Sequence, residues 1–414
     1  MKPRPRILVI NSQNSRKDNA TGITLRSLLS RMPSDNILEI FRYDSMQKTE
    51  ENIGFRSIQI PPSGMPLNYC IRKLLGYDNY MSCADREVGT ADKNSRLTLS
   101  DIAKTSAKAM IENSAIAAPK AFLREVDEFD PELIYTMGSE FYTHKWVLFF
   151  ANRYNIPIVM HYMDNWRETA FTQDKRLLWL NKKLNRQVCN LENRMHIGLT
   201  ISQHMAEAYK TKYKHQYRAL MHTVAPLNIK DIAHERLHLV YAGGLHLNRN
   251  DTLLLVSNAI AEDKDVKLYI YTSRKNREKY ERLFQTKNTE FMDAVPHSRI
   301  AEIYENADVL LHVESFDQET VDYTKYSLST KIPEYMICGK PIICFAPKNL
   351  ASYRCIVESG AGVGIQTKEE LMNSLDLLRD RNMRNQFGEA GKAYAIKHFS
   401  DDALMDVLNS VFSV

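Results

Sequence analysis

Short apolar runs rich in Val, Ile and Leu recur along the chain, separated by polar loops and by stretches with helical spacing. Such runs are typical of strands buried on both faces of a parallel sheet. In the first half they predict strands at residues 7–10, 37–41, 55–60, 133–136, 157–161 and 198–202. In the second half they predict strands at residues 237–242, 266–271, 308–313, 341–345 and 361–365. This alternation predicts an α/β fold with two Rossmann-like, doubly wound domains facing each other.

Apolar residues three and four positions apart predict helices between many of these strands. The clearest predicted helices cover residues 102–126, 146–154, 251–262, 274–287 and 298–306. Between Pro61 and Ser100 the pattern is interrupted by scattered Pro, Gly, Asn and Asp residues. The sequence predicts no regular element for that segment.

A chain of 414 residues is too long for one ordinary hydrophobic core and suits two domains. The polar stretch that begins at Pro226 separates the two series of strands. We therefore predict a first domain over residues 1–225, a linker over 226–236, a second domain over 237–387 and a helical C-terminal segment over 388–414.

Composition and charge limit the classes of protein to which this chain can belong. The chain is 44% hydrophobic with a formal charge of +5, which is too mild to imply nucleic-acid binding but compatible with an anionic substrate or an anionic membrane surface. The six cysteines are scattered without metal-ligand spacing, so we expect free thiols in a reducing compartment. No apolar run approaches the length of a signal peptide or a membrane span. We expect a cytoplasmic protein with at most a peripheral membrane contact.

One stretch of the sequence could make such a membrane contact. Residues 174–191 place Leu and Val at helical spacing beside five Lys and Arg residues, with Trp179 nearby. A basic amphipathic helix of this kind can lie on an anionic bilayer. The alternative is a helix that packs on the core and exposes a solvated basic face.

Candidate chemistry in the first half lies where predicted strands end. Gly22 follows the first strand and opens a helix, as the glycine of a phosphate-binding loop does, although a glycine there can also simply relieve a tight turn. His161 and Asp164 follow the strand at 157–161, and ligands of open α/β sheets bind beyond such strand ends. A purely structural role for His161 is the alternative.

In the second half, Gly243 and Gly244 follow a strand and precede Arg249. A further stretch, residues 327–345, combines the polar run Ser329, Thr330 and Lys331 with Glu334 and an apolar helical segment. Backbone N–H groups and the dipole at a helix N-terminus favour an anion, and Lys331 adds a full positive charge. The plainer interpretation is a helix cap that leads into a buried strand.

Together these features resemble the GT-B fold glycosyltransferases, and most closely the large retaining family called family 4. The resemblance follows nearly the whole chain in order and is strongest over residues 240–249 and 306–345. It implies that the first domain is on the acceptor side, that the second binds a nucleotide-sugar, and that residues 388–414 form a helix crossing back to the first domain.

The resemblance also implies roles for individual residues. Arg249 and Lys331 match the two basic positions that contact the donor diphosphate, and cations fixed there would stabilise the leaving group without a metal. Ser329 and Thr330 would add hydroxyl and backbone donors, and Gly244 belongs to the two-glycine turn. Gly22 resembles the glycine of the first domain whose backbone approaches the donor phosphate.

The acidic signature of that family is a pair of glutamates separated by seven residues. Glu334 matches the second, whose counterpart contacts the nucleotide ribose. Glu314 resembles the first but precedes Glu334 by 20 positions, which requires an insertion of about a dozen residues. At the ordinary spacing the chain has Tyr326, which is no carboxylate, and some variant members lack the first glutamate. Both alternatives, Glu314 inside or outside the site, stay open.

The His-Asp element of the first domain departs from the family as well. When Asp164 is aligned, Met163 occupies the usual histidine position and His161 lies two residues earlier. We nevertheless expect His161 and Asp164 to orient the sugar and the acceptor.

The function that the resemblance implies is glycosyl transfer from a nucleotide-sugar to an acceptor hydroxyl, with retention, in the assembly of surface polysaccharide, lipopolysaccharide or glycolipid. The acceptor would be a glycan or a lipid-linked sugar, and neither a cofactor nor a metal is expected. Two alternatives are a GT-B fold epimerase that acts on a nucleotide-sugar alone, and a degenerate relative that binds nucleotide-sugar or glycan as a scaffold.

Overall fold

The computed structural model describes residues 4–16, 20–43, 54–74, 97–227, 229–230, 232–296 and 299–412. These residues form two compact units. The first unit comprises the described residues up to 222 together with 404–412, and the second comprises the described residues from 223 to 403. The C-terminal segment of the first unit thus begins at Leu404, whereas the sequence had suggested a division at residue 388.

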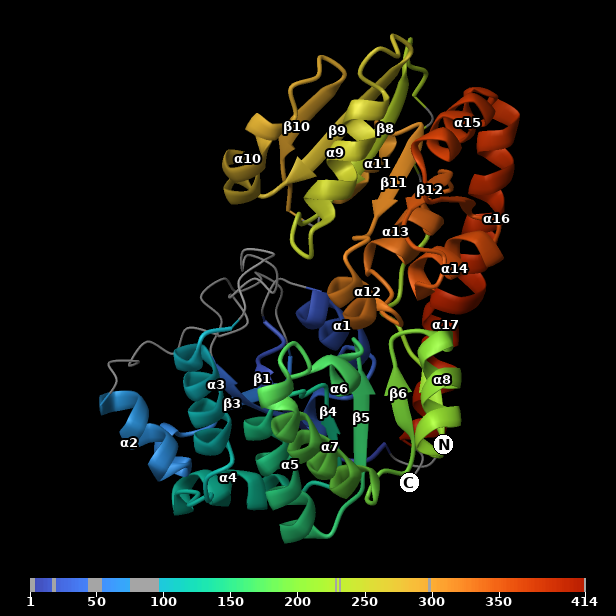
Figure 1. Cartoon of the computed structure of the whole chain (residues 1–414). Coiled ribbons are helices and arrows are strands. Elements are labelled where there is room, and N and C mark those ends of the chain that lie inside the picture. The colour runs from blue at the N-terminus through green and yellow to red at the C-terminus, as the bar shows by residue number, and fades with distance from the viewer. Residues whose placement is uncertain are drawn as a thin grey trace. The chain divides into compact units, whose positions relative to one another are not determined.

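The first unit is built on a seven-stranded sheet with the strand order β3-β2-β1-β4-β5-β6-β7 (Figure 1). Every pairing in it is parallel. Its strands are β1 (Ile7–Gln13), β2 (Ile37–Tyr43), β3 (Arg56–Gln59), β4 (Leu133–Thr136), β5 (Ile158–Tyr162), β6 (Gly198–Thr200) and β7 (Tyr217–Ala219). The order reverses between β1 and β4, which makes this the topological switch point of the sheet.

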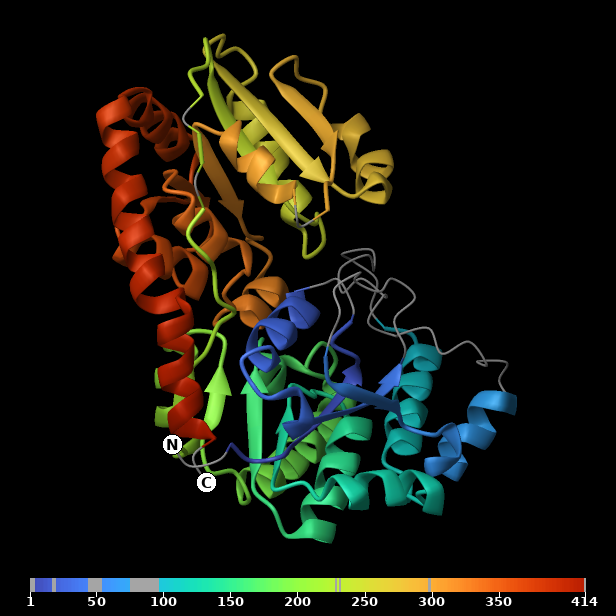
Figure 2. The same cartoon turned by 180° about the vertical axis from the view of Figure 1, so that it is seen from behind.

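Helices cover both faces of that sheet. They are α1 (Ala20–Leu29), α2 (Pro66–Leu74), α3 (Leu99–Glu112), α4 (Lys120–Phe129), α5 (Phe141–Tyr154), α6 (Trp166–Thr169), α7 (Leu178–Glu192), α8 (Gln203–Tyr213) and α17 (Asp401–Val411). One face packs on α1 and on α17, whose Leu404, Leu408 and Val411 join Ile7 and Val9 in a single core (Figure 2). The end of the chain is therefore an integral part of the first unit.

The second unit contains a six-stranded sheet with the order β10-β9-β8-β11-β12-β13, again with only parallel pairings among the described strands. Its strands are β8 (Leu237–Ala242), β9 (Val266–Thr272), β10 (Thr289–Asp293), β11 (Val309–Val313), β12 (Ile342–Phe345) and β13 (Gly362–Ile365). The order reverses between β8 and β11. The carboxyl ends of these two strands therefore border the switch point, where ligands of such sheets bind.

The helices of this unit also cover two faces. They are α9 (Arg249–Ala259), α10 (Arg274–Tyr280), α11 (Ile300–Glu305), α12 (Gln318–Thr324), α13 (Lys331–Ile337), α14 (Ala351–Glu358), α15 (Lys368–Arg379) and α16 (Arg381–Phe399). α9 and α15 share one core with β8 and β9, while α13 packs against α16. The α/β class and the two parallel sheets predicted from the sequence are confirmed.

Several predicted elements differ from the observed ones. The helix predicted over 102–126 is two helices, α3 and α4, because Pro119 cannot continue a helix and instead precedes the first turn of α4. The helix predicted over 274–287 ends at Tyr280, and the edge strands β7 and β10 were not predicted. Both are edge strands with few buried side chains, so their apolar signal in the sequence is weak.

The described cysteines are all free thiols, in agreement with the prediction, and Cys83 lies outside the described residues. Within the described part of the chain, no helix combines the length and the apolar character needed to cross a membrane.

The contact of α13 with α16 is so close that it depends on a glycine. A methyl group added to Gly388 of α16 would overlap the carbonyl oxygen of Gly339, which ends the turn after α13. Gly339 itself has a φ of 68°, a left-handed conformation that glycine adopts without strain. The position of α13, which carries Lys331, therefore rests on a glycine contact between backbones.

This contact yields the first prediction. Gly388→Ala should lower the free energy of unfolding by about 2 kcal/mol, because overpacking outweighs the gain of up to about 1 kcal/mol that alanine brings to an ordinary helix. Denaturant unfolding measures the change. The exposed neighbour on the same helix, Glu389→Ala, is the control and should shift the value by no more than about 0.5 kcal/mol. A stabilised Gly388→Ala protein would contradict the backbone contact.

Candidate functional site

The candidate site of the second unit lies where β8 and β11 end, at the switch point of its sheet. β8 leads into the turn Gly243–Gly244, and α9 begins shortly afterwards at Arg249. β11 leads directly into Glu314. The chain thus delivers a glycine turn, a guanidinium and a carboxylate to one edge of a parallel sheet, as open α/β folds do at ligand sites.

Arg249 and Glu314 form a two-point ion pair. Nε and Nη2 of Arg249 each donate to one carboxylate oxygen of Glu314 at 3.0 Å. The side chains are only 12% and 5% exposed, so the pair is largely withdrawn from water. Burial alone would raise the pKa of Glu314, but the Arg249 charge and the adjacent His312 hold it below its usual value. Glu314 is therefore ionised at neutral pH.

Lys331, the first residue of α13, approaches the same turn from the opposite side. Its ammonium lies 4.3 Å from the centre of the Tyr241 ring, and a side chain on Gly243 would overlap it. Burial, and then the Arg249 charge, lower the pKa of Lys331 to about 7. Lys331 is a half-buried amine whose protonation depends on the charge of the groups beside it.

The remaining predicted residues of this unit flank Lys331 and the turn. The hydroxyl of Ser329 accepts a hydrogen bond from the backbone N–H of Lys331 at 3.4 Å, and Thr330 precedes the helix without capping it. A side chain on Gly244 would collide with the ring of His246. Glu334 accepts a hydrogen bond from the hydroxyl of Tyr304 at 2.8 Å. The structure thus groups Gly244, Arg249, Glu314 and Lys331 tightly, with Ser329, Thr330 and Glu334 on the adjoining helix.

His161 of the first unit does not have the surroundings of a substrate contact. Its ring is 2% exposed, with Nε2 3.0 Å from the carbonyl oxygen of Leu220 and Nδ1 2.7 Å from the hydroxyl of Tyr135. A carbonyl only accepts, so Nε2 carries the proton and Nδ1 accepts from Tyr135. Burial lowers the pKa of His161 to about 4, so it is neutral. His161 thus fastens β5 to the neighbouring chain, and its role in orienting the sugar and the acceptor stays a prediction.

Asp164 and Gly22 occupy different settings in the same unit. Asp164 is half-buried in the turn between β5 and α6, at the carboxyl edge of the sheet. Gly22 is buried in the first turn of α1 rather than in the loop before it. Both lie at the edge where the sequence analysis placed them, and their roles stay predictions.

Side chains that the sequence analysis did not single out complete the second unit's site. His312 lies 3.2 Å from Glu314, and Tyr241 lies beneath Lys331. His312 and Glu314 are two positions apart at the end of one strand, so their side chains share a face. That spacing was a usable signal for His312. No such signal pointed to Tyr241, because its partner Lys331 is far away in the sequence.

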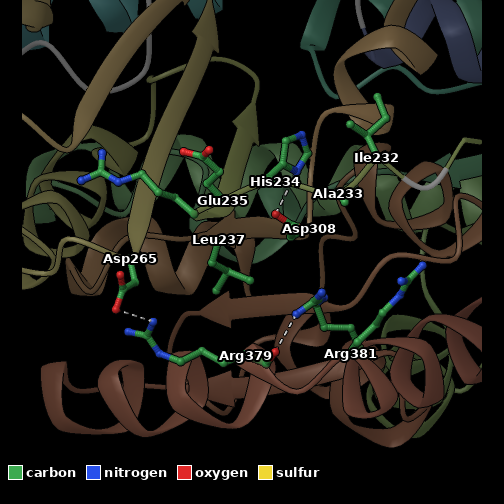
Figure 3. A pocket seen from close by; sticks show the side chains of 11 residues that line it. Ile232, Ala233, His234, Glu235, Leu237, Asp265, Asp308, Arg379 and Arg381 are labelled. Atoms are coloured by element: carbon green, nitrogen blue, oxygen red, sulfur yellow. Dashed lines mark hydrogen bonds and ion pairs between the residues drawn. The ribbon is translucent and has the colours of Figure 1, made fainter.

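A hollow of about 310 Å³ lies at the other edge of the second sheet, near the start of β8 and β11 (Figure 3). Arg236, Arg379, Arg381 and Arg384 line it, and Figure 3 shows the guanidinium groups of Arg379 and Arg381 pointing in different directions. Arg379 is paired with Asp263 and Asp265, and Arg384 donates to carbonyl oxygens of its own turn. The charges there are used by the fold, in contrast to the convergent charges around Gly243.

No group of three or more His, Cys, Asp or Glu side chains within the described part of the chain is arranged to hold a metal ion. The candidate site instead gathers two cations, Arg249 and Lys331, with Glu314 paired to Arg249 and Glu334 on the adjoining helix. An anion is the ligand that such an arrangement can bind.

Comparison with known proteins agrees with this description. Residues 236–378, which contain the whole candidate site of the second unit, match the profile of a family described as glycosyl transferases group 1. Among curated proteins, none matches this sequence.

Solved structures match over nearly the entire chain. HepE of Anabaena, solved in complex with UDP, is 15% identical with a TM-score of 0.64, covering 99% of this chain and 100% of its own. Sucrose-phosphate synthase of Thermosynechococcus elongatus is 12% identical with a TM-score of 0.63, covering 98% of each chain. A mutant of S. aureus TarM, in complex with Fondaparinux, alpha-GlcNAc-glycerol and UDP, is 11% identical with a TM-score of 0.62, covering 99% of this chain and 100% of its own.

These likenesses establish the fold, and the match to the group 1 glycosyltransferase profile covers residues 236–378. The resemblance to GT-B glycosyltransferases predicted from the sequence is confirmed.

The burial of Lys331 leads to a prediction about stability and pH. The folded protein releases the Lys331 proton near pH 7, while the unfolded chain keeps it up to its ordinary pKa of about 10.4. In that window the unfolded state binds more protons, so Lys331 makes the free energy of unfolding rise with pH. Lys331→Met should remove this rise and be more stable than the wild type at pH 7.

Denaturant unfolding at several pH values between 7 and 9.5 measures the effect. The control is Lys397→Met, an exposed lysine of α16, whose stability should run parallel to that of the wild type. A Lys331→Met protein that is less stable than the wild type at pH 7 would show that Lys331 is a favourable, fully charged partner in the ligand-free fold.

Proposed function

We propose that this chain, whose residues 236–378 match the profile of the group 1 glycosyltransferases, transfers a hexose-type sugar from a nucleotide-sugar to an acceptor hydroxyl with retention of configuration. The observation that carries the proposal is the cluster of Arg249, Glu314 and Lys331 around the two-glycine turn after β8. Glu314 is paired with Arg249, and burial together with the Arg249 charge disfavours the charged form of Lys331 in the ligand-free site. A donor diphosphate would supply negative charge beside both cations.

The chemistry follows from that charge balance. When the bond between sugar and diphosphate breaks, negative charge grows on the leaving diphosphate. Arg249 and Lys331, held in place before the reaction, stabilise that charge without reorganising, which is the most effective form of electrostatic catalysis. Lys331 would become fully protonated once the diphosphate lies beside it. The chain's own cations thus do the work for which other transferases use a metal.

Neighbouring positions take the other parts of the donor and acceptor. Glu334, oriented by Tyr304, would bind the ribose, and Ser329 and Thr330 would donate to phosphate oxygens. Gly22 would approach the donor phosphate through its backbone. Asp164, at the carboxyl edge of the first sheet, would orient the reacting sugar and acceptor.

HepE and TarM were both solved with UDP, which supports UDP-sugars as the first donors to test. The acceptor would be a glycan or lipid-linked sugar in the assembly of surface polysaccharide, lipopolysaccharide or glycolipid. The protein would act in the cytoplasm, at the inner face of the membrane.

The test is turnover by purified protein. We expect release of the nucleoside diphosphate from one of UDP-glucose, UDP-galactose, UDP-N-acetylglucosamine or GDP-mannose, stimulated by a cell-envelope acceptor fraction and retained in EDTA. Lys331→Met should lower the rate about 100-fold or more, because removing one group that stabilises transition-state charge costs 10²–10³ in kcat. Lys397→Met should keep the wild-type rate. NMR of the product's anomeric proton tests retention.

Three outcomes would contradict the proposal in different ways. A changed sugar formed from the donor alone would indicate an epimerase. Binding of donor without any turnover would indicate a scaffold. Activity that is lost in EDTA and restored by a divalent cation would contradict catalysis by the chain's cations alone.

The membrane contact needs a narrower description than the sequence suggested. The apolar stripe of α7 (Leu180, Leu184, Val188 and Leu191) is buried in the first unit, so it is core. Leu178 and Trp179 at the start of the helix remain 38% and 44% exposed, next to the exposed Lys182. We propose that this end of α7, rather than its whole length, touches an anionic bilayer through Trp179 and the neighbouring lysines.

Vesicle binding tests this contact. Lys182→Gln/Lys183→Gln should weaken binding to vesicles of phosphatidylglycerol and phosphatidylcholine about 30-fold, since each basic residue near such a surface contributes about 1 kcal/mol. Removing two exposed lysines at the end of α8 instead, Lys210→Gln/Lys214→Gln, gives the control with the same net charge. Equal binding of both double variants would mean that α7 only serves the core.

A further inference from the structure

The carboxylate of Glu314 is surrounded by other groups of the protein rather than by solvent, since its side chain is only 5% exposed. We propose that Glu314 is a positioning residue: it clamps the Arg249 guanidinium in the orientation that meets the donor diphosphate, and it is not itself a ligand of the sugar. This inference rests on the proposed function and assigns Glu314 its part in that site.

The carboxylate oxygens of Glu314 are already engaged. One accepts from Nε of Arg249 at 3.0 Å, and the other accepts from Nη2 of Arg249 at 3.0 Å and lies 3.2 Å from Nε2 of His312. The side chain is 5% exposed and His312 is 1% exposed. Because so little of the side chain is exposed, little of this carboxylate is open to a sugar hydroxyl, and drawing it away from Arg249 would break a buried ion pair, which is strongly unfavourable.

The backbone of Glu314 is fixed as firmly as its side chain. Its carbonyl oxygen accepts from the hydroxyl of Thr252 at 2.8 Å, and its N–H donates to the carbonyl oxygen of Phe345 at 3.1 Å. Thr252 and Arg249 are three positions apart in α9 and so lie on one helix face. The first turn of α9 is thus bonded to Glu314 twice: Arg249 bonds to its side chain and Thr252 to its backbone carbonyl. That turn cannot rotate without loss of both contacts.

The clamp decides which N–H groups Arg249 presents to a ligand. The pair uses Nε and Nη2, so Nη1 is the nitrogen directed away from Glu314, and it lies 3.4 Å from Nε2 of His246 at the exposed side of the turn. A guanidinium is planar, so holding one edge fixes the direction of the other. Orientation that is already complete before the donor binds lowers the barrier of the chemical step.

The position of Glu314 in the sequence agrees with this role. It immediately follows β11, and α12 intervenes before α13 begins at Lys331. Glu314 is therefore placed by its strand and by α9, while Glu334 is placed by α13. The two glutamates are held by different elements of the fold, so they are not a pair of equivalent donor ligands.

A double-mutant cycle tests the proposal with the single variants Glu314→Gln and Arg249→Met and the double variant. Turnover of the UDP-sugar that the wild type uses best gives kcat, and calorimetry gives the affinity for UDP. Glu314→Gln should lower kcat about 10-fold or more while UDP affinity changes less than about threefold, because lost alignment is offset by lost repulsion of the phosphates. In the Arg249→Met background the same change should alter kcat by less than about twofold.

Two further variants keep the test decisive. Arg249→Lys retains the charge but cannot bond both oxygens, so it should reproduce the kcat loss even if Glu314→Gln folds poorly. Glu319→Gln, on the exposed side of α12, is the control and should keep the wild-type kcat. Thermal unfolding of every variant separates loss of folded protein from loss of rate per folded molecule.

The outcomes are distinct. Additive losses of kcat in the cycle, or an unchanged kcat in both Glu314→Gln and Arg249→Lys, would overturn the positioning role. So would a fall in affinity for the UDP-sugar in Glu314→Gln with UDP affinity and kcat preserved, which would make Glu314 a sugar ligand. A wild type that binds neither UDP nor GDP and releases neither from its sugars would overturn the proposed function itself, and this inference with it.

Discussion

The ion pair between Arg249 and Glu314 is the interaction on which the site of the second unit depends. Withdrawing two charges from water costs several kcal/mol for each ion unless the pairing is close and well aligned. The parallel sheet meets this condition because β8 and β11 are neighbours that end at the same edge. Arg249 follows one of these ends and Glu314 the other, so the topology itself brings the partners within 3.0 Å.

The same constraint explains the state of Lys331. Glu314 is paired with Arg249, and Glu334 accepts a hydrogen bond from the hydroxyl of Tyr304. The pKa of Lys331 falls to about 7 because of burial and because a second cation lies close by. Burial of Lys331 beside the Arg249 cation destabilises the ligand-free site, and an anionic ligand relieves this repulsion. Strain of this kind is the usual cost of a functional site.

The sequence predicted what depends on local pattern and on order along the chain. Strands buried in a parallel sheet appear in the sequence as apolar runs, so the sequence predicted β4 and β8 at their observed residues. It also placed Arg249 and Lys331 near the ends of predicted strands and helices. What the sequence did not predict depends on contacts between distant residues. His161 resembled a ligand because it ends a strand, but its burial comes from Tyr135 and Leu220, and no pattern around residue 161 encodes those partners.

Glu314 shows why spacing in sequence can mislead where geometry does not. Its place is fixed by β11 and by Thr252, whereas the distance to Glu334 along the chain depends on how many residues fill the connection. Lengthening a connection between fixed ends is cheap, about 0.6 kcal/mol for each doubling. Here the extra residues also form α12, which Asp317 caps by accepting from the backbone N–H of Thr320 at 3.1 Å. The insertion therefore leaves the ion pair intact, and it is this pair, rather than the interval to Glu334, that identifies Glu314 as part of the site.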